Sequence, residues 1–152
     1  MRRSSSLLCL TLLLASLLPL SAHDHAIGVG KERMEMMQQW GKHLKSIRER
    51  IDARRDLGSI KADAEAIATQ APHVAHLFPK GSTQKPTEAR AAIWQNWADF
   101  ERKAAALEAV SKKLVNADLN DFDAISAEAR ALTQACAACH EKYRSKSRKE
   151  AK

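Results

Sequence analysis

Apolar residues recur at intervals of three and four along four stretches of the chain, the spacing that gathers side chains on one face of a helix. Alanine and long unbranched residues dominate these stretches, and none of them alternates as a strand would. The pattern therefore predicts four amphipathic helices. The positions are, in chain order, Met37, Trp40, Leu44, Ile47 and Ile51; Ile60, Ala64, Ile67 and Ala71; Ile93, Trp97, Phe100, Ala104, Leu107 and Leu114; and Phe122, Ile125, Ala129, Leu132, Cys136, Cys139 and Tyr143.

Three breaks in the pattern separate the predicted helices. The longest covers residues 71–86, which include three prolines and Gly81 and are predicted to form a loop. The other two lie around Gly58 and over residues 116–121, where short polar side chains favour turns and helix caps. Four helices joined by two short connections and one longer one predict an all-α fold, an antiparallel four-helix bundle.

A capping signal precedes the third predicted helix. We expect Thr87 to be its N-cap and Glu88 to lie in its first turn, where a carboxylate interacts favourably with the helix dipole.

The amino terminus has the three-part organisation of a secretory signal: two arginines, an apolar run from Leu7 to Leu18, and then small residues. The apolar run is too short to span a bilayer comfortably, and no other stretch of the sequence is continuously apolar. We therefore expect residues 1–22 to be a cleaved signal peptide and residues 23–152 to form one domain without a membrane span. The mature protein is expected in the periplasm.

Removal of the leader takes away two arginines and no acidic residue, so the formal net charge falls from +7 to +5. This moderate positive charge suits an acidic protein partner, and an exported protein is not expected to bind nucleic acid. Cys9 leaves with the leader. Cys136 and Cys139 are therefore the two cysteines of the mature chain, and they function in an oxidising compartment.

A mature chain that begins His23-Asp24-His25 offers a free amine, two amides and an imidazole that can chelate copper or nickel. The competing interpretation is that these histidines are unused, as is common at mobile termini.

The sequence CAACH, from Cys136 to His140, is the most informative motif in the chain. On a helix, residues three and four apart share a face, so both thiols and the imidazole project from adjacent turns. That geometry fits covalent haem attachment, in which two thiols bind the vinyl groups along one edge of the macrocycle and the imidazole coordinates iron. Because the same face is predicted to point into the bundle, an apolar macrocycle would replace core side chains there.

Three other interpretations of the motif are open at this point. A thioredoxin-like redox pair normally begins a helix after a strand, whereas this pair lies near the end of a helix. A structural zinc site needs four ligands, and the mature chain has no further cysteines and only scattered histidines. A disulfide across one helical turn is the plainest structural alternative. In an exported chain the motif favours haem.

Several stretches together resemble the class II cytochromes c, the family of cytochrome c prime and its low-spin, methionine-ligated relatives. The matching stretches are CAACHEKYR near the carboxyl end, LFPKGS in the loop, AAIWQNWADFERKAAAL in the third predicted helix and RMEMMQQWGKHLKSI in the first. The position of CxxCH in the last helix and the Arg–x–x–x–Met pattern in the first distinguish this family from others with the same motif. The resemblance implies one covalently bound haem c per chain, held within the bundle near the C-terminal helix.

The resemblance also implies a role for individual residues. Cys136 and Cys139 would form the thioether bonds, and His140 would be the proximal iron ligand. Arg144 lies one turn beyond His140, where the family has a basic residue beside the proximal imidazole. The alternative for Arg144 is a solvated charge in a basic tail with Lys142, Lys146, Arg148 and Lys149.

The function depends on the iron position opposite His140. A thioether sulfur there gives six-coordinate, low-spin iron suited to electron transfer, whereas an empty position gives five-coordinate, high-spin iron that binds small gases. Periodicity places Met36 and Met37 equally far from the centre of the apolar stripe, with Met34 farther away. The resemblance favours Met37 as the distal ligand, because Arg33 precedes it by four residues, and leaves Met36 as the reserve. A methionine that serves only as core filler is the alternative.

We therefore expect a periplasmic monohaem c-type cytochrome that carries electrons and is not an enzyme. The alternative is a five-coordinate, high-spin protein of the cytochrome c prime type that binds nitric oxide or carbon monoxide. The basic tail beside the attachment site is expected to dock on acidic redox partner proteins, an effect that salt weakens. A homodimer through the first two helices is a further expectation from the resemblance.

Overall fold

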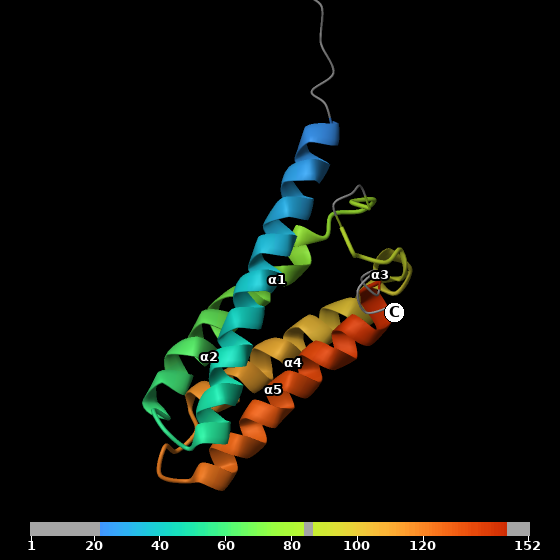
Figure 1. Ribbon diagram of the computed structural model, residues 1–152. Coiled ribbons are helices and arrows are strands. Elements are labelled where there is room, and N and C mark those ends of the chain that lie inside the picture. Colours follow the sequence, from blue (N-terminus) through green and yellow to red (C-terminus); the bar gives the residue numbers. More distant parts are fainter. Residues whose placement is uncertain (1–21, 84–86, 146–152) are drawn as a thin grey trace, which may run out of the picture.

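The computed structural model describes residues 22–83 and 87–145, with side chains from residue 28 onward. The predicted leader lies outside these residues apart from Ala22, and so do the side chains of His23 and His25. Two antiparallel helix pairs make up most of the fold (Figure 1). The elements in chain order are α1 (Ala22–Ala53), α2 (Gly58–Gln70), the 3₁₀ helix η1 (Ala71–Leu77), α3 (Ala92–Gln95), α4 (Trp97–Val115) and α5 (Phe122–Tyr143).

The four long helices form the expected all-α bundle. α1 pairs with α2, α4 pairs with α5, and α2 packs against α4, whereas α1 has few contacts with α5. The predicted apolar stripes face one another in the core. Ile47, Ile60, Leu114 and Leu132 are fully buried. Burying side chains of this size stabilises the fold by about 1.5–3 kcal/mol each relative to leaving them exposed.

The two short connections lie where the polar residues predicted them. Residues 54–57 join α1 to α2, and Arg54 and Asp56 there adopt positive φ angles of 47° and 52°. Before α5, the carboxylate of Asp121 accepts a hydrogen bond from the backbone nitrogen of Ala124 at 2.9 Å and caps the helix.

The third predicted helix begins later than expected and is broken. Thr87 and Glu88 lie outside any helix, and α3 begins only at Ala92, so the predicted cap at Thr87 is wrong. The helical turn of α3 ends at Asn96, where φ is −128° and ψ is 46°, and α4 begins at the next residue. The amide of Asn96 donates to the Ala92 carbonyl oxygen at 3.0 Å, a local side-chain bond that competes with the helical ladder.

The predicted loop is partly helical. Residues 71–77 form η1, with Pro72 near its start, where a missing backbone donor costs nothing. The chain after η1 passes through Gly81, whose φ of 81° suits glycine, before it reaches residue 83. This connection covers the end of the bundle at which α1 and α5 diverge in Figure 1.

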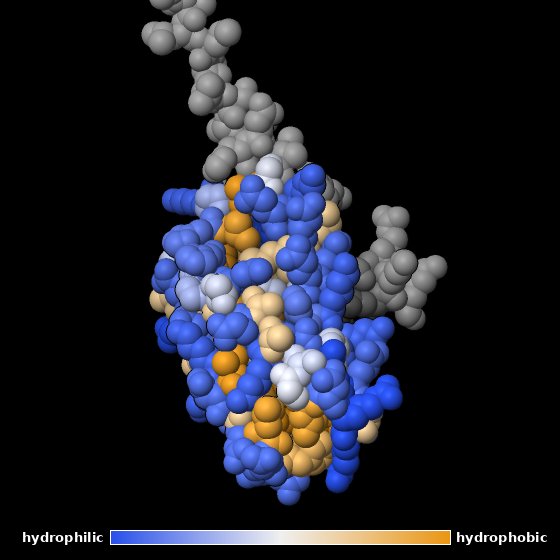
Figure 2. All heavy atoms as spheres, turned by 90° about the vertical axis from the view of Figure 1, so that its left-hand side faces the viewer, coloured by the Kyte–Doolittle hydropathy of each residue, from blue (hydrophilic) through white to orange (hydrophobic). Residues whose placement is uncertain are grey.

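Figure 2 shows the face made by α1 and α2. Hydrophilic residues cover most of it, and apolar residues gather at the lower end of the molecule, where α1 connects to α2. Among the described side chains, Met34 is the one large hydrophobic residue that is exposed, at 42%. In the described part of the chain, no helix combines the length and the apolar character that crossing a membrane requires.

Candidate haem site

The last two turns of α5 carry the CAACH motif, and the helix continues through it to Tyr143. Cys136 and Cys139 therefore lie one turn apart, and they are not joined in a disulfide. Burial raises the pKa of the Cys136 thiol to about 11 and also raises the pKa of the Cys139 thiol. Both thiols keep their protons near neutral pH, which disfavours a redox pair, because the reactive form of a redox cysteine is the thiolate.

A cavity of about 650 Å³ lies between α1 and α5 at the end of the bundle where the two helices diverge. Its volume falls in the range of small-molecule and cofactor sites. Cys139 and His140 form part of its wall on α5. The aromatic and aliphatic side chains of Phe78, Ile93 and Phe100 make much of the remaining wall.

This cavity has the properties that a covalently bound haem requires. Its surface is mostly apolar, and a cysteine thiol and an imidazole share one wall. The opposite wall, on α1, leaves space for the macrocycle. Gly41 of α1 lines the cavity, and a Cβ atom built on it would meet nothing within 4 Å. Cys136 does not line the cavity; it lies one turn before Cys139, half-buried against the core.

The three candidate sulfurs of α1 differ in position. Met37 lines the cavity from the side opposite His140 and is half-buried. Met36 packs against the hydrophobic core and is not part of the cavity wall. Met34, which periodicity placed farthest from the stripe, does line the cavity. Met37 and Met34 therefore line the cavity, whereas Met36, the predicted reserve ligand, does not, and ligation of iron by Met37 stays a prediction.

Arg33, one turn before Met37, is only 5% exposed and fixes α1 to the connection after η1. Its Nε and Nη2 donate to the Leu77 carbonyl oxygen at 3.0 and 2.8 Å, and Nη2 also donates to Ser82 Oγ at 2.8 Å. The guanidinium lies 4.0 Å from the centre of the Phe78 ring. Burial lowers the pKa of Arg33 to about 10, so the group stays charged at neutral pH.

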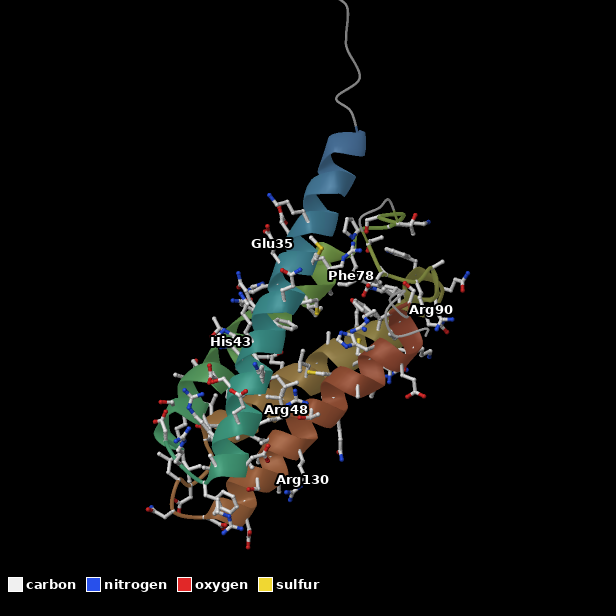
Figure 3. All side chains as sticks on the ribbon, viewed as in Figure 1. Glu35, His43, Arg48, Phe78, Arg90 and Arg130 are labelled. Atoms are coloured by element: carbon white, nitrogen blue, oxygen red, sulfur yellow. The ribbon has the colours of Figure 1, made fainter. Side chains whose placement is uncertain are left out.

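The resemblance used Arg33 only for its spacing from Met37, whereas the structure shows which groups its guanidinium contacts. Figure 3 shows Phe78 close to α1 and Arg90 near the end of α5, both at the cavity end of the bundle, whereas Glu35 points outward from α1.

Arg144 follows the last residue of α5 and lines the cavity together with His140, and its predicted place beside the proximal imidazole stays a prediction. It is half-buried rather than fully solvated, and its Nε lies 3.3 Å from Glu88 Oε2. The neighbouring residue Ala89 forms an isolated antiparallel bridge with Arg144. The structure therefore brings Glu88 and Ala89 into the site, although the sequence pattern assigned Glu88 to a helix.

The aromatic residue Tyr143 was expected to be on the inner face of α5, and it lines the cavity at 3% exposure. Its ring meets Phe100 edge to face, with ring centres 5.5 Å apart, and Phe100 in turn meets Phe78 at 4.8 Å. Phe78 was not predicted as a site residue, and Phe100 was predicted only as a core position of the third helix. The stretch LFPKGS contained a signal for Phe78, because an aromatic residue in a proline-rich loop packs where the loop closes over the bundle.

No group of three or more histidine, cysteine, aspartate or glutamate side chains in the described part of the chain is arranged to hold a metal ion. A structural zinc centre built on Cys136 and Cys139 therefore has no further ligands there. The proposed copper or nickel chelate at His23-Asp24-His25 stays a prediction, because those side chains lie outside the described residues.

Comparisons with known proteins show the family of the chain. The profile of the family described as Cytochrome C' matches residues 29–144. A cytochrome c-556 from Agrobacterium tumefaciens (strain B2A) is 32% identical over 122 residues, which cover 78% of this chain and 98% of the relative. The nitric oxide complex of a cytochrome c prime variant from Alcaligenes xylosoxidans is 27% identical, with a TM-score of 0.69, and the match covers 78% of this chain and 94% of that one. A cytochrome c' with ligand-controlled dimer dissociation is 21% identical, with a TM-score of 0.74 and coverage of 85% and 100%.

The bundle, the cavity and the CxxCH motif together define a c-type haem protein of the four-helix class. The chain belongs to the cytochrome c' family. Its cofactor is a covalently attached haem c, one per chain.

Proposed function

We propose that this protein is an exported, periplasmic electron carrier whose haem iron is bound by His140 and Met37. The observation that carries the proposal is that Met37 from α1 and His140 from α5 line the same cavity. An imidazole on one side and a thioether sulfur on the other is the ligand set typical of electron-transfer cytochromes, since it keeps iron six-coordinate and low-spin.

A haem bound here supplies a one-electron couple, and the chain supplies its attachment, its ligands and its surroundings. Cys136 and Cys139 would hold the macrocycle edge, and His140 would provide the nitrogen ligand. Phe78, Phe100 and the other apolar wall residues would keep water from the iron, so that little around the iron has to rearrange when an electron arrives or leaves. Electron transfer at the haem requires no substrate bound to the chain, so we propose that the protein is not an enzyme.

A second candidate function is the binding of nitric oxide or carbon monoxide by five-coordinate iron. One relative supports it, because the cytochrome c prime variant from Alcaligenes xylosoxidans was solved as a nitric oxide complex. The position of Met34 is compatible with it, since this exposed side chain of α1 also lines the cavity, so the cavity wall reaches the protein surface there. In this alternative, Met37 would be a wall residue that leaves the iron open.

We also propose that the partners are acidic redox proteins and that copies of the chain form dimers through α1 and α2. The positive charge of the mature chain supports the first proposal, and the dimeric cytochrome c' relative supports the second. Most of the basic tail lies outside the described residues. A reduction rate by an acidic partner that falls as salt rises would support docking by charge, and sedimentation would give the oligomeric state.

Carbon monoxide addition to the reduced protein tests the choice between carrier and gas binder. The carrier should bind the gas only slowly, because Met37 must leave the iron first, and its reduced spectrum should be low-spin before the gas is added. Rapid, complete binding to iron that is already high-spin would contradict the carrier function and support the gas binder.

A further inference from the structure

We propose that residues 87–89 form a strap that sets the distance between the two helices carrying the axial ligands, and that Thr87 is its positioning residue. The inference rests on the proposed function, because its consequence for the iron assumes that Met37 is a ligand. It concerns residues that neither the sequence pattern nor the haem motif assigned to the site.

The first end of the strap is attached to α1. Arg33 Nη1 donates a hydrogen bond to Thr87 Oγ1 at 2.7 Å, the shortest bond that this guanidinium makes. Thr87 Oγ1 also accepts from the backbone nitrogen of Ala89 at 3.1 Å, which fixes the hydroxyl within the strap. Since Arg33 lies one turn before Met37 on the same face of α1, the bond acts on the turn that presents the sulfur.

The second end of the strap is attached to the end of α5. The Ser145 nitrogen donates to the Glu88 carbonyl oxygen at 2.8 Å, and the Arg90 nitrogen donates to the Tyr143 carbonyl oxygen at 2.9 Å. Arg144 lies between these two bonds, pairs with Ala89 in the antiparallel bridge and approaches the Glu88 carboxylate. These contacts hold the chain one turn beyond His140.

The strap therefore connects the two ligand-bearing turns at an end of the bundle where little else does. α1 and α5 have few direct contacts and diverge toward the cavity in Figure 1. The connection runs from Arg33 through Thr87 to Glu88 and then to the end of α5. Without the Thr87 hydroxyl, Nη1 of the buried guanidinium keeps only its longer bond to the Ser82 carbonyl oxygen, at 3.5 Å, and α1 loses its direct link to the strap. We therefore expect the turn of α1 that presents Met37 to move more freely relative to the end of α5.

The test compares Thr87→Val, which keeps the branched shape and removes the hydroxyl, with Thr87→Ser, which keeps the hydroxyl. Carbon monoxide binding to the reduced holoprotein measures how often the distal position opens. T87V should bind the gas about tenfold faster than wild type and show more high-spin iron, because losing a bond to a charged donor shifts the open population by about that factor. T87S should behave like wild type. When wild-type iron is low-spin, wild-type rates in T87V, or an equal increase in both variants, would overturn the proposal.

A second measurement separates the strap from the proposed function. Hydrogen exchange followed by mass spectrometry should be faster in T87V at residues 33–40 of α1 and at residues 142–145, and unchanged at residues 104–114 of α4. This result does not depend on which residue binds iron. If wild-type iron is already high-spin, the carrier function fails, and the strap is supported or overturned by the exchange pattern. Uniform acceleration across all helices would mean general destabilisation and would overturn the strap.

Discussion

The phenol of Tyr143 donates a hydrogen bond to Asp99 Oδ2 across 2.6 Å and joins the last turn of α5 to the first turn of α4. Lys142 Nζ donates to the same carboxylate oxygen at 2.9 Å. Because Tyr143 lines the cavity three residues after His140, these bonds hold the proximal wall against α4. They give the His140 turn a second anchor in addition to the bundle core.

Tyr143→Phe should leave the aromatic packing intact and remove the bond to Asp99. We expect Tm to fall by a few degrees and the reduction potential to change, because the Asp99 charge near the site is then less well compensated. Differential scanning calorimetry and a redox titration measure the two effects. Phe122→Leu, far from the cavity, is the matched control that should leave the potential unchanged. A potential equal to that of wild type in Y143F would mean that the bond only supports the fold.

Asp99 should make stability depend on pH in the acid range. Hydrogen bonds from Lys142 and Tyr143 hold the pKa of this carboxyl well below its usual range. Its stabilisation is therefore fully present above the unfolded-state pKa of about 3.9 and is lost as pH falls from there toward the folded-state pKa. Asp99→Asn should be less stable than wild type at pH 7, and the difference between their Tm values should shrink below about pH 4. A constant difference from pH 7 to pH 3 would contradict this assignment.

Arg33→Met should cost about 3 kcal/mol of unfolding free energy, because it leaves the Leu77 carbonyl oxygen and the Ser82 hydroxyl buried without their donor. Denaturant unfolding of the holoprotein measures the change. Arg48→Met on the exposed face of α1 is the control and should stay within about 0.5 kcal/mol of wild type. A loss equally small in R33M would show that the network around Arg33 contributes little.

The attachment chemistry predicts a specific pattern among cysteine variants. Cys136→Ala and Cys139→Ala should each retain haem through the remaining thioether, and the double variant should lose covalent haem. Mass spectrometry of the unfolded, exported protein distinguishes these outcomes by the mass of the haem. Full haem mass on the double variant would place the attachment elsewhere in the chain.

The sequence was sufficient to predict the bundle, because helical periodicity and capping are local properties. The stripes that include Ile47 and Ile60 are examples, since both residues are buried, and the polar residues 116–121, predicted to favour turns and caps, contain the cap Asp121. The motif from Cys136 to His140 was informative for the same reason, since its spacing alone puts three functional side chains on one helical face. The family comparison then supports the haem.

The rest of the site depends on contacts between distant residues, which periodicity does not report. Thr87 looked like a helix cap because its type suits one, but in the fold its hydroxyl bonds to Arg33, 54 residues away. Periodicity placed Tyr143 on the inner face of α5, but it could not report that the Tyr143 hydroxyl bonds to the Asn96 carbonyl oxygen and to Asp99 from the neighbouring helix. On an ideal helix, Met34 lies farther from the centre of the apolar stripe than Met36 and Met37. It nevertheless lines the cavity, at the end of the bundle where α1 diverges from α5.

Paramagnetic resonance of the ferric protein, recorded for wild type and for Met37→Leu, tests most directly whether the iron has a ligand from each of these two helices. The account predicts low-spin iron in wild type and high-spin iron in M37L, with Met36→Leu and Met34→Leu both like wild type. High-spin iron in wild type, or low-spin iron that survives in M37L, would contradict it.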